Sequence, residues 1–149
     1  MPSLKLERII AIKYLDTSVV FDFYVKSSRS KKVQAFINQH QHDLIISTWV
    51  ETEFYGVLGR RVRDGGLPNT LAERAAKRFE EHQSKGLFQV YGLDGKCMKY
   101  AAALTRRFHL GIKSADALHL ALVQLENLEL ITSDKDLSTS AQRLQQFQI

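Results

Sequence analysis

The sequence predicts an α/β fold: a parallel sheet of four to five strands with helices on both faces. Short apolar runs rich in β-branched residues recur along the 149 residues, and such runs are typical of buried strands. The segments between them have helical spacing, and strands that alternate with helices form parallel sheets. No repeat, low-complexity tract or linker interrupts this alternation. We therefore expect a single domain over residues 1–149.

The first third of the chain supplies two strands and two helices. "IIAIKYL" (9–15) is predicted to be a buried strand, and "TSVVFDFYV" (17–25) a short helix. In "SRSKKVQAFINQH" (28–40), apolar residues at helical spacing predict a second helix with Ser30 as its N-cap. "DLIIS" (43–47) is predicted to be the second strand.

Two longer helices follow in the middle of the chain. "WVETEFYGVLGRRVRD" (49–64) is expected to end at the glycine pair that follows it, because glycine readily takes the left-handed conformation after a helix. The next predicted helix begins where Thr70 and Glu73 have the spacing of a capping box, and it closes on Gly86.

The last third repeats the alternation. "LFQVYGL" (87–93) and "LELITS" (128–133) are predicted strands. Three helices are predicted here. Asp94 caps the first, which ends at Gly111. The second is the nearly all-apolar "SADALHLALVQLEN" (114–127), and the third is "DLSTSAQRLQQF" (136–147), with Leu137, Ala141 and Leu144 on one stripe.

Composition narrows the classes of function. The formal net charge is +5, and a basic surface favours polyanions such as nucleic acid. The single cysteine, Cys97, excludes an internal disulfide and a cysteine-based metal cage, which suits a reducing cytosol. No apolar run approaches the roughly 20 residues of a transmembrane helix, and the first residues lack a signal-peptide cleavage site. A soluble cytoplasmic protein is expected.

Acidic residues stand where predicted strands end and predicted helices begin: Asp16, Glu51, Glu53, Asp116, Asp134 and Asp136. In a parallel sheet these points share one edge, so the carboxylates can converge. Crowded carboxylates repel one another and stay ionised when hard cations such as Mg²⁺ or Mn²⁺ hold them. Such a site facing a polyanion is suited to metal-assisted phosphodiester hydrolysis.

Each acid also has a structural interpretation. Asp16 or its neighbour Thr17 fits an N-cap. Asp116 suits the start of a helix, which favours negative charge. Asp134 and Asp136 fit a turn and an N-cap, and Glu51 and Glu53 fit solvated helix charges.

Other marked residues favour structural roles. His119, flanked by apolar residues, is interpreted as a packed helix residue rather than a general base. Trp49, Phe54 and Tyr55 suit a core or dimer surface better than a base-stacking platform. Cys97 is interpreted as a small buried hydrophobe.

Four ordered motifs, "YLDTSVV", "ISTWVETEF", "SADALHLA" and "LITSDKDL", resemble the PIN-domain nucleases, in particular VapC-like toxins of toxin–antitoxin pairs. The resemblance implies four catalytic acids: Asp16, Glu53, Asp116 and Asp134. Glu53 is preferred to Glu51 because it lies six residues after Ser47. The implied metal ligands are Asp16, Asp116 and Asp134, with Glu53 and Asp136 secondary. Ser18 and Thr132 are the implied supporting hydroxyls.

The resemblance further implies Mg²⁺- or Mn²⁺-dependent RNA cleavage that leaves a 5′-phosphate, a cognate VapB-like antitoxin and a homodimer. Arg60, Arg61 and Arg63 end the predicted helix that starts beside Glu53, so we expect them to help seat the RNA backbone. Two alternatives stay open: a PIN-domain RNA-processing nuclease without an antitoxin, and an RNA-binding module without catalysis.

Overall fold

A computed structural model describes residues 12–146 of the chain. The described residues form a four-stranded sheet, seven α-helices and one short 3₁₀ helix. In chain order these elements are β1 (Lys13–Leu15), α2 (Thr17–Tyr24), α3 (Ser30–Gln39), β2 (Leu44–Ser47), α4 (Thr48–Arg63), α5 (Asn69–Ser84), β3 (Gln89–Tyr91), α6 (Gly95–Arg106), η1 (Phe108–Leu110), α7 (Ser114–Leu125), β4 (Glu129–Ile131) and α8 (Lys135–Gln146). Residues 9–11 of the first predicted strand lie outside the described residues.

The sheet has the order β3-β2-β1-β4, and all three strand pairs are parallel. The first strand in sequence therefore lies between the second and the fourth. Tyr14 pairs with Ile45 on one side and with Leu130 on the other. Both predictions, a parallel sheet and alternation with helices, are confirmed.

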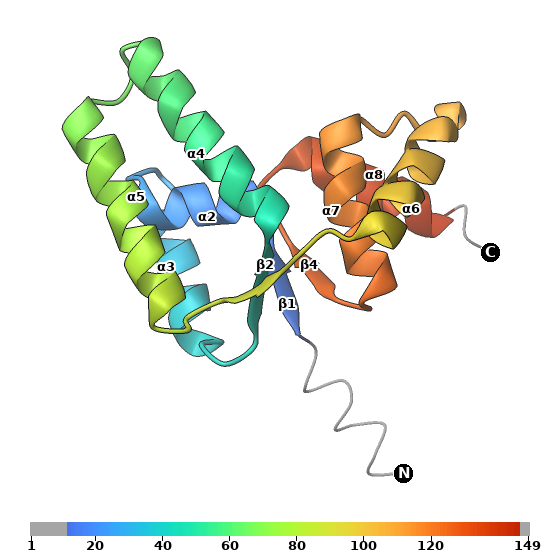
Figure 1. The fold of residues 1–149 in the computed structure, drawn as a ribbon, viewed down its shortest axis with the longest axis horizontal. Coiled ribbons are helices and arrows are strands. Elements are labelled where there is room, and N and C mark those ends of the chain that lie inside the picture. The colour runs from blue at the N-terminus through green and yellow to red at the C-terminus, as the bar shows by residue number, and fades with distance from the viewer. Residues whose placement is uncertain (1–11, 147–149) are drawn as a thin grey trace.

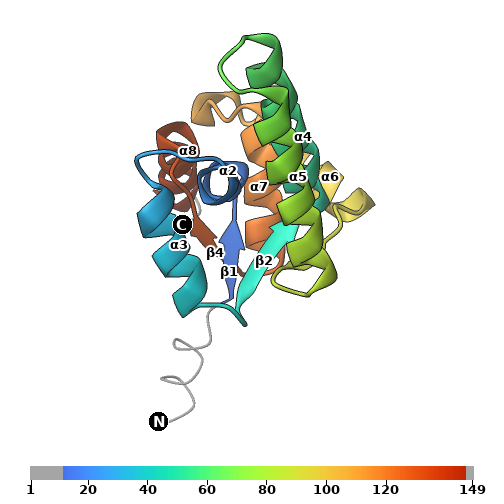
Figure 2. The ribbon, with the colours of Figure 1, turned by 90° about the vertical axis from the view of Figure 1, so that its left-hand side faces the viewer.

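Helices cover both faces of the sheet (Figure 1). Helices α2 to α5 lie on one side, and α6, α7 and α8 lie on the other. Figure 2 looks from the first side and shows α2 beside α4 and α5, with α7 behind them. The core fills the space between the sheet and these layers, and Tyr14, Phe54 and Phe79 are fully buried in it.

Side-chain caps fix the starts of three helices. Asp16, Ser47 and Asp94 accept hydrogen bonds from the backbone N–H groups of Val19, Val50 and Cys97 at the starts of α2, α4 and α6. The predicted cap at Asp94 is confirmed, and so is the structural interpretation of Asp16 as an N-cap.

Two predicted caps are wrong. Ser30 is the first residue of α3 rather than its cap, and its hydroxyl donates to the backbone carbonyl of Asp22. Helix α5 begins one residue before Thr70, with Pro68 in the cap position and no side-chain cap. Proline fixes φ near the helical value and needs no hydrogen-bond acceptor, so the helix starts there and Thr70 is already inside it.

Glycines follow the ends of α4 and α5, as predicted. The third predicted helix, which was expected to run to Gly111, ends earlier. Gly65 and Gly86 have φ of +76°, which suits glycine after α4 and α5. The segment before Gly111 (φ +62°) is divided, because α6 ends at Arg106 and η1 follows as a separate turn. None of the described helices has the length and apolar character needed to cross a membrane.

Candidate functional site

A pocket of about 310 Å³ opens at the carboxyl edge of the sheet. Four of the predicted acids line it: Asp16 after β1, Glu53 in α4, Asp116 in α7 and Asp134 after β4. They come from segments as much as 118 residues apart in sequence, the difference between 134 and 16. The parallel topology therefore brings them together as the sequence predicted.

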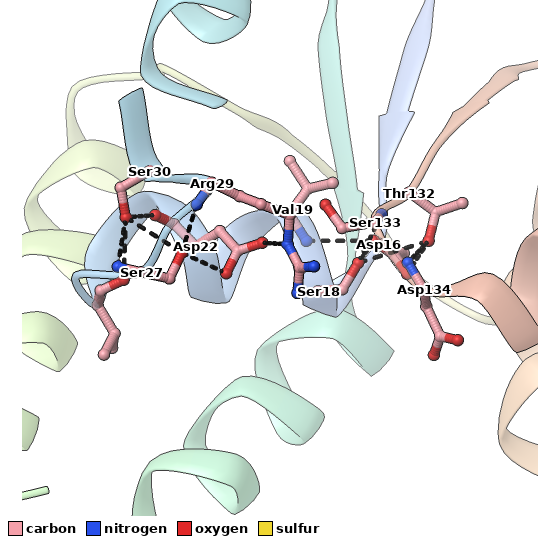
Figure 3. Close-up of polar contacts among 11 residues, drawn as sticks. Asp16, Ser18, Val19, Asp22, Ser27, Arg29, Ser30, Thr132, Ser133 and Asp134 are labelled. Atoms are coloured by element: carbon pink, nitrogen blue, oxygen red, sulfur yellow. Dashed lines mark hydrogen bonds and ion pairs between the residues drawn. The ribbon is translucent and has the colours of Figure 1, made fainter. Parts of the chain in front are cut away.

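Asp16 lies at the base of this acidic pocket and is 3% exposed. One carboxylate oxygen, Oδ1, accepts from the Ser18 hydroxyl at 2.7 Å and from the Val19 N–H at 3.3 Å, and Oδ2 accepts from the Thr132 hydroxyl at 2.7 Å (Figure 3). Burial raises the pKa of Asp16, and the two hydroxyls oppose that rise because they favour the charged form. The residue is thus both a helix cap and a wall of the pocket.

The supporting hydroxyls also join β4 to α2. Ser18 Oγ accepts from the backbone N–H of Ser133 at 3.0 Å, and Thr132 Oγ1 accepts from the backbone N–H of Asp134 at 2.9 Å. Ser18 and Thr132 therefore fix Asp16 relative to the turn that carries Asp134. Ser18 lies beside the first acid, where the resemblance placed it. Thr132, expected to accompany Asp134, contacts both acids, because its hydroxyl donates to Asp16 and accepts from the Asp134 N–H.

Glu53 is held from two sides. Its Oε1 accepts from the Thr17 hydroxyl at 2.6 Å and lies 2.6 Å from His119 Nε2. Glu51, the alternative in the sequence, does not line the pocket.

His119 connects Glu53 to the centre of the sheet. Its Nδ1 lies 2.7 Å from the Tyr14 hydroxyl, which lies 2.9 Å from Ser47 Oγ. Ser47 Oγ already accepts from the Val50 N–H, so its own proton is free to go to Tyr14. Tyr14 then donates to Nδ1, and Nε2–H donates to Glu53. With this assignment every donor in the buried chain has an acceptor.

Asp116 is held far less. It is half-buried in the first turn of α7, and no described residue donates a hydrogen bond to its carboxylate. Burial and, next, the negative charge of Asp134 raise the pKa of Asp116. His119 and the positive charge of Lys113 oppose this rise without cancelling it.

The two acids after β4 have different surroundings. Asp134 Oδ1 accepts from the backbone N–H groups of Asp136 and Leu137 at the start of α8, at 2.8 and 3.3 Å. Asp136 does not line the pocket; its side chain is 77% exposed and lies 3.7 Å from Lys113 Nζ. Asp134 therefore combines a cap with a place in the pocket, as Asp16 does.

The donor set suits a hard divalent cation, since carboxylate oxygens are the ligands that Mg²⁺ and Mn²⁺ prefer. In the part of the chain that the structure describes, no three His, Cys, Asp or Glu side chains are already arranged around one metal position. The residues therefore fit a cation by their chemistry and their location. Four carboxylates line one pocket in addition to the Arg29-paired Asp22, and a cation would relieve the repulsion between Asp116 and Asp134.

Two arginines border the acidic pocket. Arg29 lines it while its Nε donates to Asp22 Oδ2 at 3.0 Å, and Asp22 is 3% exposed (Figure 3). Arg61 lines it with its guanidinium 5.6 Å from the centre of the Phe21 ring. Of the three predicted RNA-binding arginines, Arg61 alone lines the pocket, and Arg60 and Arg63 are exposed elsewhere on α4.

Sequence reasoning missed several of these partners. Asp22 carried a usable signal, because a charge inside the apolar run "SVVFDFYV" needs a partner when that run is buried. Tyr14 and Thr17 carried none, since a tyrosine in a strand and a threonine at a helix start are ordinary. His119 is packed, as predicted, and in addition bonds to both Tyr14 and Glu53.

Comparisons with known proteins agree with this fold. The PIN domain family model matches residues 13–141. VapC20 of Mycobacterium tuberculosis, a sarcin–ricin loop cleaving toxin, has a similar structure (TM-score 0.69, 17% identity, 86% of this chain and 94% of that chain). So do a toxin–antitoxin complex from Klebsiella pneumoniae (0.59, 22%, 83% and 88%) and VapBC2 of Rickettsia felis bound to a promoter DNA fragment (0.63, 16%, 83% and 88%). Comparison with curated protein sequences gives no significant match.

Proposed function

Because the chain belongs to the PIN domain family, we propose that it is a metal-dependent endoribonuclease of the VapC toxin type. One observation carries the proposal: besides Asp22, which is paired with Arg29, four carboxylates from four separate segments line a single open pocket. A protein that used these acids only as caps and surface charges would have no reason to gather them. Their mutual repulsion costs free energy that a bound cation offsets.

We assign the metal to Asp16, Asp116 and Asp134, with Glu53 as a secondary ligand and Mg²⁺ or Mn²⁺ as the ion. Asp136, the other secondary candidate, is the weaker one because it lies outside the pocket. An ion bound there supplies the positive charge that activates water and stabilises the phosphodiester during hydrolysis.

The chain's own residues position these acids and the substrate. Ser18 and Thr132 hold the Asp16 carboxylate by its two oxygens. His119 keeps a proton on Nε2 and directs it to Glu53, so the unshared oxygen of Glu53 is left for the pocket. Arg61, at the rim, offers a guanidinium to phosphate oxygens.

The substrate and partners follow from the same proposal. RNA is the expected substrate, because the net charge of +5 suits a polyanion. Two of the structural neighbours are complexes of a toxin with its antitoxin, which supports a VapB-like antitoxin as partner. A homodimer is expected from the family resemblance. Such an enzyme would act on cytoplasmic RNA.

The test uses Asp16→Asn. Asparagine caps a helix about as well as aspartate, so the variant should still fold with α2 intact, yet it should lose at least about 100-fold in Mn²⁺-dependent RNA cleavage. RNA ends from cells that express the wild type would identify the target, and chelation should abolish the activity. Cleavage near the wild-type rate would make Asp16 a cap alone and remove the basis of the proposal.

Glu51→Gln is the matched control for the removal of an acid. Glu51 lies on α4, as Glu53 does, and does not line the pocket. The Glu51→Gln variant should cleave RNA at the wild-type rate, whereas Glu53→Gln should cleave it more slowly. Co-expression distinguishes a toxin from an RNA-processing nuclease. If the protein is a toxin, a small protein encoded beside it should relieve the growth arrest that it causes.

A further inference from the structure

A second pocket, of about 450 Å³, lies next to the acidic one between the end of α2 and the turn that joins α4 to α5. Four cations line it: Lys26 after α2, Arg61 in α4, and Arg74 and Arg78 in α5. Among the described residues, no acidic side chain lines it. We call it the cationic pocket.

The cations of this pocket are not neutralised by acidic side chains. Within residues 12–146, none of the four forms an ion pair with an acidic side chain. Two of the guanidiniums lie over aromatic rings instead, Arg61 at 5.6 Å from the Phe21 ring centre and Arg78 at 5.7 Å from that of Tyr24. An aromatic face orients a guanidinium and leaves its N–H donors open.

Two features of the backbone, Gly66 and the start of α5, also favour an anion in the cationic pocket. A Cβ on Gly66 would lie 3.3 Å from Arg61 Nε, so glycine at this position leaves the room that the Arg61 side chain occupies. The first turn of α5, a helix of 16 residues without a side-chain cap, contributes Leu71 to the wall. The start of such a helix carries partial positive charge.

Arg61 lines both pockets. An extended polyanion that passes Arg61 can therefore place one phosphate beside the carboxylate site and another among Arg74, Arg78 and Lys26. A repeating phosphate backbone meets this requirement, because it carries a charge at every nucleotide and guanidinium groups bind phosphate in pairs of hydrogen bonds.

We propose that the cationic pocket is a backbone-phosphate site for the RNA strand that enters the acidic pocket, and that Arg61 is the link between the two. This inference rests on the proposed nuclease function. It names the path of the substrate: along the α4–α5 turn, on the α2 side of the sheet.

The experiment measures binding without cleavage. A fluorescent single-stranded RNA is titrated with protein in chelator at several salt concentrations, for the wild type and for Arg74→Gln/Arg78→Gln. The double variant should bind about tenfold more weakly, and its salt dependence should be shallower by about 0.7 for each phosphate that the protein no longer neutralises. An unchanged slope would overturn the proposal.

Controls separate a specific phosphate site from a general effect of charge or folding. Lys96→Gln/Lys99→Gln removes the same two charges from exposed positions on α6, and it should bind RNA more tightly than the Arg74/Arg78 variant, close to the wild type. Lys26→Gln alters an exposed loop position, so it should weaken binding without lowering the melting temperature. Equal effects from both double variants would overturn the proposal.

RNA cleavage with Mn²⁺ and binding of a polyglutamate peptide distinguish the remaining outcomes. If the wild type cleaves no RNA with Mn²⁺ but the binding slopes still differ, the nuclease proposal fails and the phosphate site stands. If the double variant binds RNA normally but no longer binds a polyglutamate peptide, the pocket is a docking site for an acidic protein segment, and the phosphate proposal is wrong.

Discussion

The acidic and cationic pockets share Arg61 but hold their charges in different ways. In the acidic pocket Asp16 and Glu53 are fixed by hydroxyl, backbone and imidazole donors. In the cationic pocket Arg61 and Arg78 rest on aromatic rings and have no anionic partner among the described residues. The carboxylates of Asp16 and Glu53 are thus positioned by directional bonds, whereas the guanidiniums of Arg61 and Arg78 are positioned by stacking that leaves their donors unused.

This difference separates two tasks. Groups held by short hydrogen bonds keep one geometry, which hydrolysis requires. Groups held by stacking stay available to any phosphate, which sequence-tolerant binding requires. Changes in the acidic pocket should therefore alter turnover, and changes in the cationic pocket should alter affinity.

The largest expected effect is that of Asp116→Asn. Cleavage should fall at least about 100-fold, because a predicted metal ligand loses its charge. Binding of RNA in chelator should stay equal or improve, since a negative charge beside a polyanion is removed. Single-turnover cleavage and fluorescence titration measure the two quantities. Weaker RNA binding by this variant would contradict the assignment of turnover to the acidic pocket and of affinity to the cationic pocket.

Tyr14→Phe comes next. It removes the hydroxyl between Ser47 and His119. His119 Nδ1 then loses its donor and the Ser47 hydroxyl proton loses its acceptor, so the free energy of unfolding should fall by about 1–3 kcal/mol. With Glu53 less firmly oriented, kcat should fall by about 10–100-fold while KM stays unchanged. Tyr100→Phe, which removes a hydroxyl bonded to Gln124 away from the pocket, should affect stability alone. A kcat at the wild-type level in Tyr14→Phe would make the buried chain purely structural.

Gly66→Ala should have a smaller effect. The added methyl would meet Arg61 Nε at 3.3 Å, and a displaced Arg61 should weaken RNA binding a few-fold without changing kcat at saturating RNA. At Gly92 a Cβ would have no neighbour within 4 Å, so Gly92→Ala is the control and should bind normally. Equal affinities of the two variants would show that the position of Arg61 is not critical.

The smallest expected effect concerns His82, whose Nδ1 lies 2.6 Å from the Tyr24 hydroxyl. Burial and the positive charges of Arg78 and Lys85 lower the pKa of His82 below its usual 6.5. The folded state therefore binds this proton less readily than the unfolded chain does, and stability should decline as the pH falls below about 6.5.

Melting curves between about pH 7 and pH 5 measure this decline. His82→Gln should flatten the dependence, and Arg78→Gln should flatten part of it because one of the repelling charges is gone. If Arg78→Gln leaves the dependence unchanged, the charge of Arg78 does not reach His82.

The fold could be predicted because its signals are local. Apolar runs and helical spacing indicated all four strands and the helices that separate them. The errors at Ser30 and Thr70 arose where two capping geometries compete: Pro68 starts α5 early, and the Ser30 hydroxyl binds the Asp22 carbonyl instead of a helix N–H.

The site was predictable only in part. Asp16 and Asp134 lie just after β1 and β4, so the parallel topology suffices to bring these two together. Glu53 lies inside α4, and Asp116 lies in α7, which follows η1 rather than a strand, so the choice of these two depended on the family resemblance. Their partners depend on contacts that no spacing encodes, because Tyr14 meets His119 across 105 residues and Ser47 across 33. The cationic pocket was missed for the same reason, since Arg74 and Arg78 lie on an ordinary amphipathic helix and join Arg61 only after α4 and α5 pack.

The place of β1 in the sheet also sets the order in which the site can be completed during protein synthesis. Its Asp16 is made first, yet one neighbour of β1 is β4, and the hydroxyl of Thr132 and the carboxylate of Asp134 come from the far end of the chain. A domain generally folds as a unit once its chain has left the ribosome. A nascent chain that has not passed residue 134 therefore lacks a wall of the acidic pocket. The four acids of a chain still being synthesised therefore cannot yet act together on the RNA of the ribosome that makes it.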